Sequence, residues 1–409
     1  MIFFAQQRDE IKECLIMVYF HEIDVNKFLT EYWQKKPLLI RQALPDFVNA
    51  LTADELAGLS MEEEIESRLV FETPEKAPYW HLKRGPFIAK DFKTLPETHW
   101  TLLVQGVDRF IPEVTQMLDY FNFIPQWRVD DVMISYAVEH GSVGPHYDNY
   151  DVFLYQAQGK RKWSLTTKHC RTDNYLPGVE LRIMQQFLTE EEYILEEGDM
   201  LYLPPHVGHY GIAIGNDCMT YSFGYRSYQG QELLDSFADY LAEKKPTGLL
   251  YQDPDWTVNQ GSAEITKQAW LNAKKLLQTV IDDESHLQHW FGCFVTQFDQ
   301  QAETLLPIPL ADEEMIDIGL FTRQLTKSEG MIRNASCRFA YQVNSQESRL
   351  NLFINGDEWP DNDVSPALIK LVCNHRLLTN TALLPFRNRE QDLAFLFKLC
   401  QLQWLELID

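Results

Sequence analysis

The chain has 409 residues, with 36 Lys and Arg against 60 Asp and Glu, which gives a formal net charge of −24. At about 150 residues per domain, this length predicts two or three domains and enough material for a buried core. Its hydrophobic content of 45% and aromatic content of 13% exclude a chain that is disordered throughout. The negative charge argues against broad binding to nucleic acid or to an anionic membrane, and suits a basic partner.

The sequence also predicts the cellular compartment. No stretch approaches the ~20 consecutive apolar residues that a membrane span needs. The N-terminus begins Met-Ile-Phe-Phe and then becomes charged, unlike a signal peptide. The seven cysteines are scattered and form no Cys-x-x-Cys pair, so we expect neither a disulfide framework nor a zinc ribbon. We therefore expect a cytoplasmic protein.

A regular pattern begins only at Met17, so residues 1–16 are predicted to be an extension or a mis-assigned start. A strand is expected over residues 18–20. A helix should open at Asp24, because apolar residues follow it at i, i+3 and i+4 spacing. We expect the first large domain to cover residues 17–230.

Residues 132–226 read as a β-rich region. Runs of β-branched and aromatic residues predict strands over 132–138, 151–156, 160–166, 200–203 and 219–225. Hairpin turns are expected at residues 157–159 and 197–199, where glycine occurs. Many short strands at this spacing indicate a sandwich or a small barrel.

Helical periodicity follows Gly230 and defines a predicted helical region over residues 231–305. Helices are expected over 233–241, from Ser262 and over 287–298. The last has an aromatic stripe that either packs within the chain or forms a subunit interface. Residues 306–409 form a predicted small mixed domain. From residue 307 onward there are 10 Lys and Arg against 14 Asp and Glu, so even a winged helix here would lack the basic surface of a DNA reader.

The strongest chemical signal lies at residues 144–148, Gly-Pro-His-Tyr-Asp. His146 and Asp148 are two residues apart, so on a strand they project to the same face. His209 follows 61 residues after Asp148, behind a Gly-Asp turn and a Pro-Pro pair. Two histidines and one carboxylate make a facial triad, which leaves room on Fe(II) for a bidentate cosubstrate and dioxygen. His-x-Asp alone also suits an ordinary surface turn, and His206 competes with His209 as the second histidine.

A second signal is an arginine on an apolar strand face. In residues 160–166, Lys-Arg-Lys-Trp-Ser-Leu-Thr, alternation groups Arg161 with Trp163 and Leu165 and puts both lysines on the other face. A buried guanidinium needs an anionic partner. A dicarboxylate ligand held bidentately is one candidate, and a structural salt bridge is the other. Ser135 could add a hydroxyl to the same pocket.

Together these motifs resemble the JmjC-type ribosomal oxygenases, and among them the bacterial arginine hydroxylases that act on a large-subunit ribosomal protein. The resemblance covers most of the chain from Met17, including the helical region and, more weakly, the C-terminal part. It is carried by residues 127–135, 146–153, 159–163 and 198–205.

The resemblance implies an α+β fold. Its parts are a double-stranded β-helix core of the cupin and JmjC kind, a helical dimerisation region and a C-terminal winged-helix-like domain. It implies Fe(II) on His146, Asp148 and His209, and 2-oxoglutarate with its distal carboxylate on Arg161 and help from Ser135. Dioxygen would be the second cosubstrate. The implied protein partner is a basic ribosomal protein of the large subunit, and the implied assembly is a homodimer, without direct DNA binding or a membrane.

Two alternatives remain open at the level of sequence. The same oxygenase chemistry could act on histidine or methyl-lysine of another basic protein, because the sequence does not determine which carbon is oxidised. The chain could also be a metal-binding dimeric interaction module without turnover. The complete triad together with an inward Arg161 argues against such a module, which has no need of both.

Overall fold

The structure is a computed structural model that describes residues 17–408 except 22, 46, 74–78, 245–247, 256, 258–262, 299–304, 312–316, 345–348 and 361–362. The chain divides into two compact units, Met1–Ser227 and Tyr228–Asp409. Residues 1–16 lie outside the described residues, so the prediction about them stays a prediction, as does the finer division between residues 305 and 306. Among the described residues, no helix is both long and apolar enough to cross a membrane.

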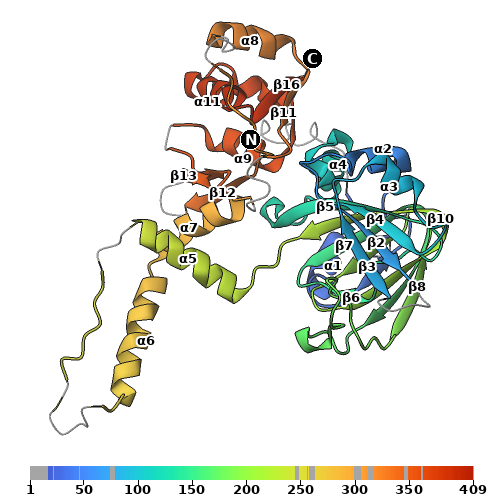
Figure 1. The fold of residues 1–409 in the computed structure, drawn as a ribbon. Helices are drawn as coiled ribbons and strands as arrows, with labels where there is room; N and C mark the ends of the chain where they lie inside the picture. The colour runs from blue at the N-terminus through green and yellow to red at the C-terminus, as the bar shows by residue number, and fades with distance from the viewer. Residues whose placement is uncertain are drawn as a thin grey trace. The chain divides into compact units, whose positions relative to one another are not determined.

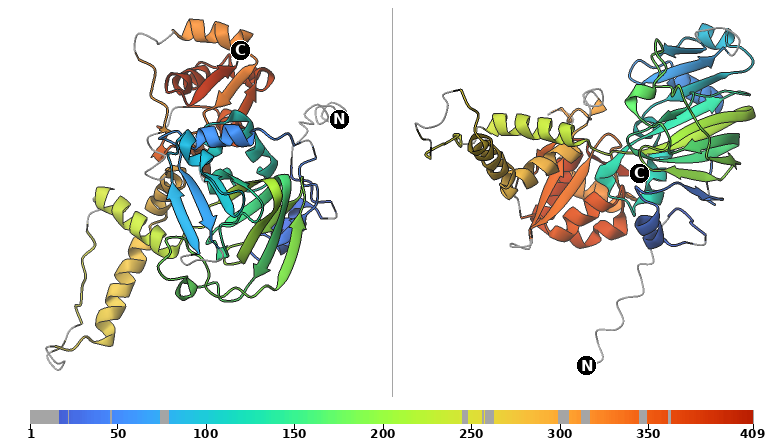
Figure 2. Two further views of the ribbon diagram at one scale, coloured as in Figure 1. Left: turned by 45° about the vertical axis from the view of Figure 1, so that its right-hand side comes forward. Right: turned by 90° about the horizontal axis from the view of Figure 1, so that it is seen from below.

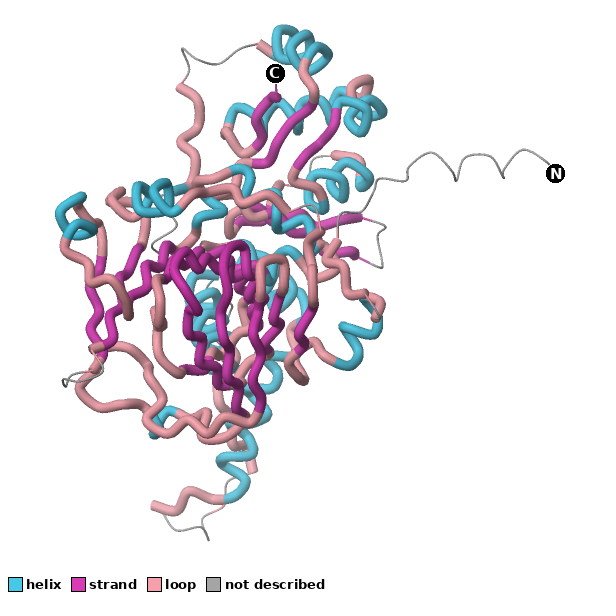
Figure 3. Tube along the Cα trace, turned by 90° about the vertical axis from the view of Figure 1, so that its right-hand side faces the viewer, coloured by secondary structure: helices cyan, strands magenta, loops and turns pink. Residues whose placement is uncertain are grey.

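The first unit is built on one ten-stranded sheet, in the order β1-β9-β7-β10-β5-β4-β2-β3, with β6 paired to β10 and β8 to β7 (Figures 1 and 3). Every pairing in it is antiparallel. The strands are β1 (Leu38–Ile40), β2 (Ser67–Glu72), β3 (Trp80–Arg84), β4 (Trp100–Val104), β5 (Val129–Ala137), β6 (His146–Tyr147), β7 (Asp151–Thr166), β8 (Glu191–Leu195), β9 (Met200–Leu203) and β10 (Gly208–Tyr225).

Helices of the first unit are short. They are α1 (Val25–Glu31), α2 (Ala53–Leu59), α3 (Ala89–Lys93) and α4 (Pro112–Met117). α1 begins where predicted, because the Asp24 carboxylate accepts a hydrogen bond from the Lys27 amide at 2.7 Å. Phe28 on α1 is fully buried and contacts Tyr202 of β9 edge-to-face. The strand predicted over residues 18–20 is wrong: amides of this segment bond to carbonyls in two separate parts of the chain, so no ladder forms.

Strands β7 and β10 form the long central pair, and they lie side by side in both views of Figure 2. The hairpin predicted at residues 157–159 is wrong, because β7 runs continuously through it. Gly159 has a positive φ of 68° and lies where the register of the pair shifts, so its turn-like sequence marks a bulge. The bulge changes the parity of the strand, and Val152 before it therefore shares an apolar cluster with Trp163 after it.

The segment 197–199 is a turn, with Gly198 at a positive φ of 93°. It does not close a hairpin, since β8 and β9 both pair with β7 rather than with each other. The main core of the unit lies on the other side of β7, where Phe153 and Tyr155 are almost fully buried. Both faces of β7 are thus covered along its first part, which explains why residues 152–155 are apolar at every position.

The second unit contains α5 to α11 and two three-stranded sheets, in the orders β15-β11-β16 and β12-β13-β14. Its core gathers residues from α8, α9, α11 and both sheets. The elements are α5 (Gly230–Lys244), α6 (Lys267–Ile281), α7 (Glu284–Thr296), α8 (Ile318–Lys327), β11 (Gly330–Arg333), β12 (Phe339–Asn344), β13 (Arg349–Ile354), β14 (Asp357–Glu358), α9 (Pro366–Asn374), β15 (Leu377–Thr379), α10 (Asn380–Leu383), α11 (Glu390–Gln401) and β16 (Leu405–Ile408).

The three helices predicted after Gly230 are present as α5, α6 and α7, although Ser262 lies outside the described residues. The aromatic stripe of α7 packs within the unit: Trp290 is buried and its indole donates to Ser236 of α5 at 3.0 Å. α6 is different, because no described side chain on it is buried. Trp270 and Leu277 of α6 are 51% and 65% exposed. The exposed apolar helix of this region is therefore α6 and not α7.

Candidate metal and cosubstrate site

Three side chains come together at one end of the β7–β10 pair. His146 on β6 lies directly opposite His209 on β10 in the strand register. Asp148 Oδ2 lies 3.6 Å from His209 Nε2 and 4.0 Å from His146 Nε2. One ligand atom from each residue falls within 4.8 Å of the others, a spacing that suits a shared metal ion. Opposed strand positions bring the histidines together, and the two-residue spacing adds Asp148 to the same side.

Both imidazoles are fixed by the backbone. The Nδ1 atom of His146 lies 2.9 Å from the Gly144 carbonyl oxygen, and that of His209 lies 3.1 Å from the Val207 carbonyl oxygen. A carbonyl can only accept, so each Nδ1 donates and each Nε2 keeps its lone pair for a metal. Burial foremost, and then the proximity of the second imidazole, that of His146, lower the pKa of His209 to about 4. His209 is therefore neutral at pH 7, which is the form that binds metal.

Gly144 brings the His146 segment close to the wall of the site. It has a positive φ of 82°, and a Cβ there would lie 2.9 Å from Ile183 Cδ1. A side chain at this position would therefore meet both backbone strain and a clash. The competing histidine, His206, is exposed and has its own positive φ of 64°. Its amide donates to the Asp148 carbonyl, but its ring is not part of the three-residue cluster.

A cavity of about 540 Å³ opens over the triad. Arg161 lies in its wall, 3% exposed, on the inward face that alternation predicted. Its Nε and Nη2 atoms are buried and have no hydrogen-bond partner among the described residues. Lys160 and Lys162 on the outer face form ion pairs with Glu196 and Glu192.

Unpaired buried donors are costly, and a charged one is more costly still. The Arg161 guanidinium therefore offers the cavity a positive charge that needs an anionic ligand. The carboxylate of a bound dicarboxylate fits that need, and the two histidines with one aspartate fit a divalent metal with open positions. The residues present thus suit both Fe(II) and 2-oxoglutarate.

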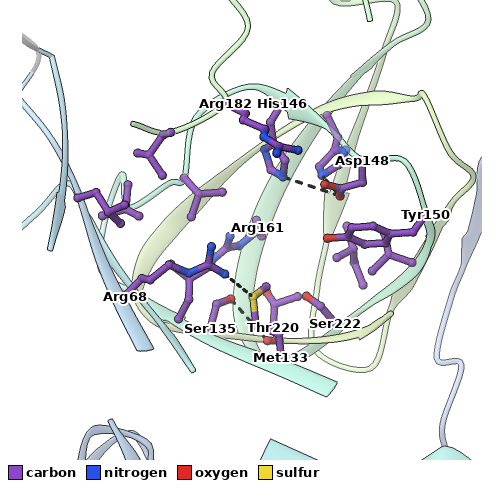
Figure 4. A pocket seen from close by; sticks show the side chains of 18 of the residues that line it. Arg68, Met133, Ser135, His146, Asp148, Tyr150, Arg161, Arg182, Thr220 and Ser222 are labelled. Atoms are coloured by element: carbon purple, nitrogen blue, oxygen red, sulfur yellow. Dashed lines mark hydrogen bonds and ion pairs between the residues drawn. The ribbon is translucent and has the colours of Figure 1, made fainter. Parts of the chain in front are cut away.

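Ser135 also lines the cavity, on β5, and it lies close to Arg161 in Figure 4. Its hydroxyl donates a long hydrogen bond of 3.5 Å to the Thr220 carbonyl. Trp163 forms part of the wall beside these residues, with its ring centroid 5.6 Å from Arg161 Cζ. Gly211 faces this indole across the strand pair, and a Cβ there would lie 2.6–2.8 Å from three ring carbons.

Sequence reasoning missed several cavity residues, including Arg68, Tyr150 and Glu180. Tyr150 could have been found, since it continues the two-residue spacing of His146 and Asp148. Its hydroxyl points into the cavity in Figure 4, although the residue is 40% exposed overall. The Asp148 carboxylate and burial of the hydroxyl raise the pKa of Tyr150 well above its ordinary value.

The chain is similar to known proteins over most of its length. Residues 116–233 match the family described as a JmjC domain, residues 279–406 match a ROXA-like winged helix, and residues 185–304 match an AraC-like ligand binding domain. The ribosomal protein uL16 3-hydroxylase of Escherichia coli is 36% identical over 282 residues, which cover 69% of this chain and 74% of that protein. The chain belongs to the JmjC-domain ribosomal oxygenases. A probable ribosomal oxygenase of Haemophilus influenzae is 32% identical over 385 residues, 89% of each chain.

Solved structures agree with this family. An X-ray structure of E. coli YcfD has a TM-score of 0.81 at 29% identity and covers 96% of this chain and 100% of its own. A structure of YcfD with cobalt and 2-oxoglutarate has a TM-score of 0.78 at 28% identity, with 96% and 99% coverage. The predicted fold class is confirmed: a JmjC and cupin-like sheet core with a winged helix at the C-terminal end. Members of this family use iron, 2-oxoglutarate and dioxygen, as the sequence predicted.

Proposed function

We propose that the protein hydroxylates an arginine side chain of a large-subunit ribosomal protein, in a reaction that depends on Fe(II) and 2-oxoglutarate. The observation that carries this proposal is the pairing of the His146, Asp148 and His209 cluster with the unpaired buried Arg161 in one cavity. The arginine target is suggested by the relative named for hydroxylation of uL16. The large negative charge of the chain supports a basic protein substrate.

In this proposal each residue has a distinct task. His146, Asp148 and His209 hold Fe(II), each histidine through Nε2. Arg161 binds the distal carboxylate of 2-oxoglutarate through its two unpaired nitrogens, and Ser135 adds its hydroxyl beside it. Bound iron and 2-oxoglutarate supply the chemistry: dioxygen converts 2-oxoglutarate into succinate and carbon dioxide, and its second oxygen atom enters a C–H bond of the substrate.

The rest of the cavity orients the target side chain. Tyr150 offers an aromatic ring beside Asp148, whereas the Met133 thioether lies away from the triad, 3.9 Å from Arg68 Nη2 (Figure 4). A guanidinium stacks well on an aromatic ring, so the Tyr150 ring suits an arginine side chain.

We further propose that the protein is a cytoplasmic homodimer. The exposed apolar residues of α6 support self-association, because single exposed residues are common but a whole helix without buried side chains is not. The winged-helix-like part would serve protein contacts rather than DNA, given its acidic balance. Sedimentation of the parent and of Trp270→Glu should distinguish a dimer that α6 holds together from a monomer.

The deciding experiment measures succinate formation by the purified protein with Fe(II), with and without recombinant uL16 from the same organism. Intact mass and fragment spectra of uL16 would follow. We expect uL16 to stimulate succinate formation and to gain one oxygen atom on an arginine. The same gain on histidine, or loss of a methyl group from lysine in another protein, would assign a different target to the same chemistry. Iron binding without turnover would favour a non-catalytic interaction module.

A further inference from the structure

The charged residues that line the cavity are mostly cationic, so few of them can bind a basic substrate. Among the described residues that line it, the cationic ones are Arg68, Arg84, Arg161 and Arg182, and the carboxylates are Asp148 and Glu180. The proposed function assigns Asp148 to the metal. Glu180 is therefore the one carboxylate of this described lining that is left for a cationic group of a substrate.

The position of Glu180 is fixed by its neighbours. It belongs to the long connection between β7 and β8, where Tyr175 and Met184 form an isolated bridge. Val179 and Leu181, on either side of Glu180, pack into an apolar cluster with Val70 of β2. This packing holds the connection without help from the Glu180 carboxylate, so replacing that carboxylate should leave the wall in place.

Glu180 is paired with Arg84, the last residue of the edge strand β3. Arg84 donates through Nε at 3.1 Å and through Nη2 to the same carboxylate oxygen. The two side chains are 57% and 61% exposed. Glu180 foremost, and Glu66 to a lesser degree, raise the pKa of Arg84. Exposed ion pairs add little stability, and a cation from a substrate can replace Arg84 at small cost.

We infer that Glu180 is a specificity-determining residue that exchanges Arg84 for a basic side chain of the polypeptide substrate, next to the target residue. This inference rests on the proposed function. Arg182 sets the direction of approach, since it lies beside His146 in Figure 4 and has no ion pair among the described residues. It repels a second cation from the metal side of the mouth, which leaves the Glu180 side as the favourable one.

The test compares removal of either partner of the ion pair. Binding of fluorescently labelled uL16 is measured without dioxygen, with Mn(II) and 2-oxoglutarate present. Glu180→Gln should weaken binding by roughly twofold to fivefold, and Glu180→Lys by about tenfold or more. Arg84→Gln should strengthen binding by about twofold, because it frees the carboxylate. The requirement for 2-oxoglutarate should not change in any of them.

Two matched variants control for net charge. Lys83→Gln removes a neighbouring cation of β3 that pairs with Asp91 outside the cavity, and Glu196→Gln removes an exposed carboxylate that pairs with Lys160. Neither control should change the dissociation constant for uL16 by as much as its partner variant. If each control changed the dissociation constant for uL16 as much as its partner variant, only overall charge would matter, and the inference would be overturned.

The opposite effects expected for Glu180→Gln and Arg84→Gln distinguish a role in substrate binding from a purely structural role. If the ion pair merely holds the wall, Glu180→Gln and Arg84→Gln weaken binding alike, and the inference is overturned while the proposed function stands. The inference is also overturned if neither variant changes binding. Parent protein that neither binds nor hydroxylates uL16 would overturn the proposed substrate, and this inference with it.

Discussion

Replacing Arg161 by Met gives the sharpest test of how the cavity holds its cosubstrate. Met keeps an unbranched side chain of similar length but removes the charge and every donor. Each charge-assisted hydrogen bond contributes roughly 1.5–3 kcal/mol. Two unpaired nitrogens, Nε and Nη2, would together contribute roughly 3–6 kcal/mol, which corresponds to a loss of affinity for 2-oxoglutarate of roughly a hundredfold to ten-thousandfold.

Without 2-oxoglutarate, the stability of the protein should change little in the same variant. Arg161 forms no ion pair among the described residues and contacts Trp163 only through its ring, so the free protein should lose little stability in Arg161→Met. With 2-oxoglutarate at a hundred times its dissociation constant, the parent gains about 2.7 kcal/mol, or roughly 5–10 °C in Tm for a unit of this size. A hundredfold weaker variant gains only about 0.4 kcal/mol at that concentration.

Thermal unfolding with Mn(II), with and without 2-oxoglutarate, measures both the stability of the free protein and its stabilisation by the cosubstrate. Arg161→Lys keeps the charge without the planar fork and should fall between the parent and Arg161→Met. Lys162→Met, one residue along the same strand on its outer face, should keep the full ligand-induced shift. A free Arg161→Met protein that melts much earlier, yet keeps the parent's shift, would assign Arg161 to the fold and refute this reasoning.

Three further changes test the site and its surroundings. His209→Ala should abolish turnover and tight Mn(II) binding while unfolding stays cooperative, and near-normal activity would contradict the triad. Gly211→Ala should destabilise the first unit by about 1–3 kcal/mol in urea, because its Cβ would lie within 2.6–2.8 Å of the Trp163 ring; an unchanged midpoint would mean that the indole moves freely. Burial foremost, then Asp130 and Asp108, raise the pKa of Asp131 to about 7. Folding therefore takes up a proton between about pH 4 and pH 7, and stability falls as pH rises through this window. Asp131→Asn should remove this pH dependence, so the stability of the variant relative to the parent should rise from pH 5 to pH 8. A stability difference that is independent of pH would show that Asp131 does not cause the fall.

Local rules were sufficient for two of the three clustered residues and for the side of the strand on which Arg161 lies. His146 and Asp148 needed only the two-residue period of a strand, and that same period put Arg161 on the inner face. The choice of His209 over His206 came from the alignment to the family, and the structure gives its geometric reason: His209 lies opposite His146 in the register. His206 instead occupies the turn before β10, where its ring faces solvent.

Features that depend on contacts between distant parts of the chain could not be predicted from the sequence. The segment at residues 157–159 has the composition of a turn, but pairing with β10 continues on both sides of Gly159 and makes it a bulge. Local composition cannot distinguish the two, because both need a residue with positive φ. Glu180 was missed for a related reason. Its place at the cavity depends on how a long connection packs against β2, which no periodicity within that connection encodes.

The two faces of β7 explain why Arg161 is left without a protein partner. Carboxylates are not scarce near this strand, since the neighbouring edge strand β8 and the turn after it are acidic. Glu192 and Glu196 point to the outer face, however, and pair there with Lys162 and Lys160. The strand alternation that puts these lysines outside also turns Arg161 away from every one of those carboxylates and into the cavity. A ligand anion is then the partner that remains, which is why the cavity suits a dicarboxylate.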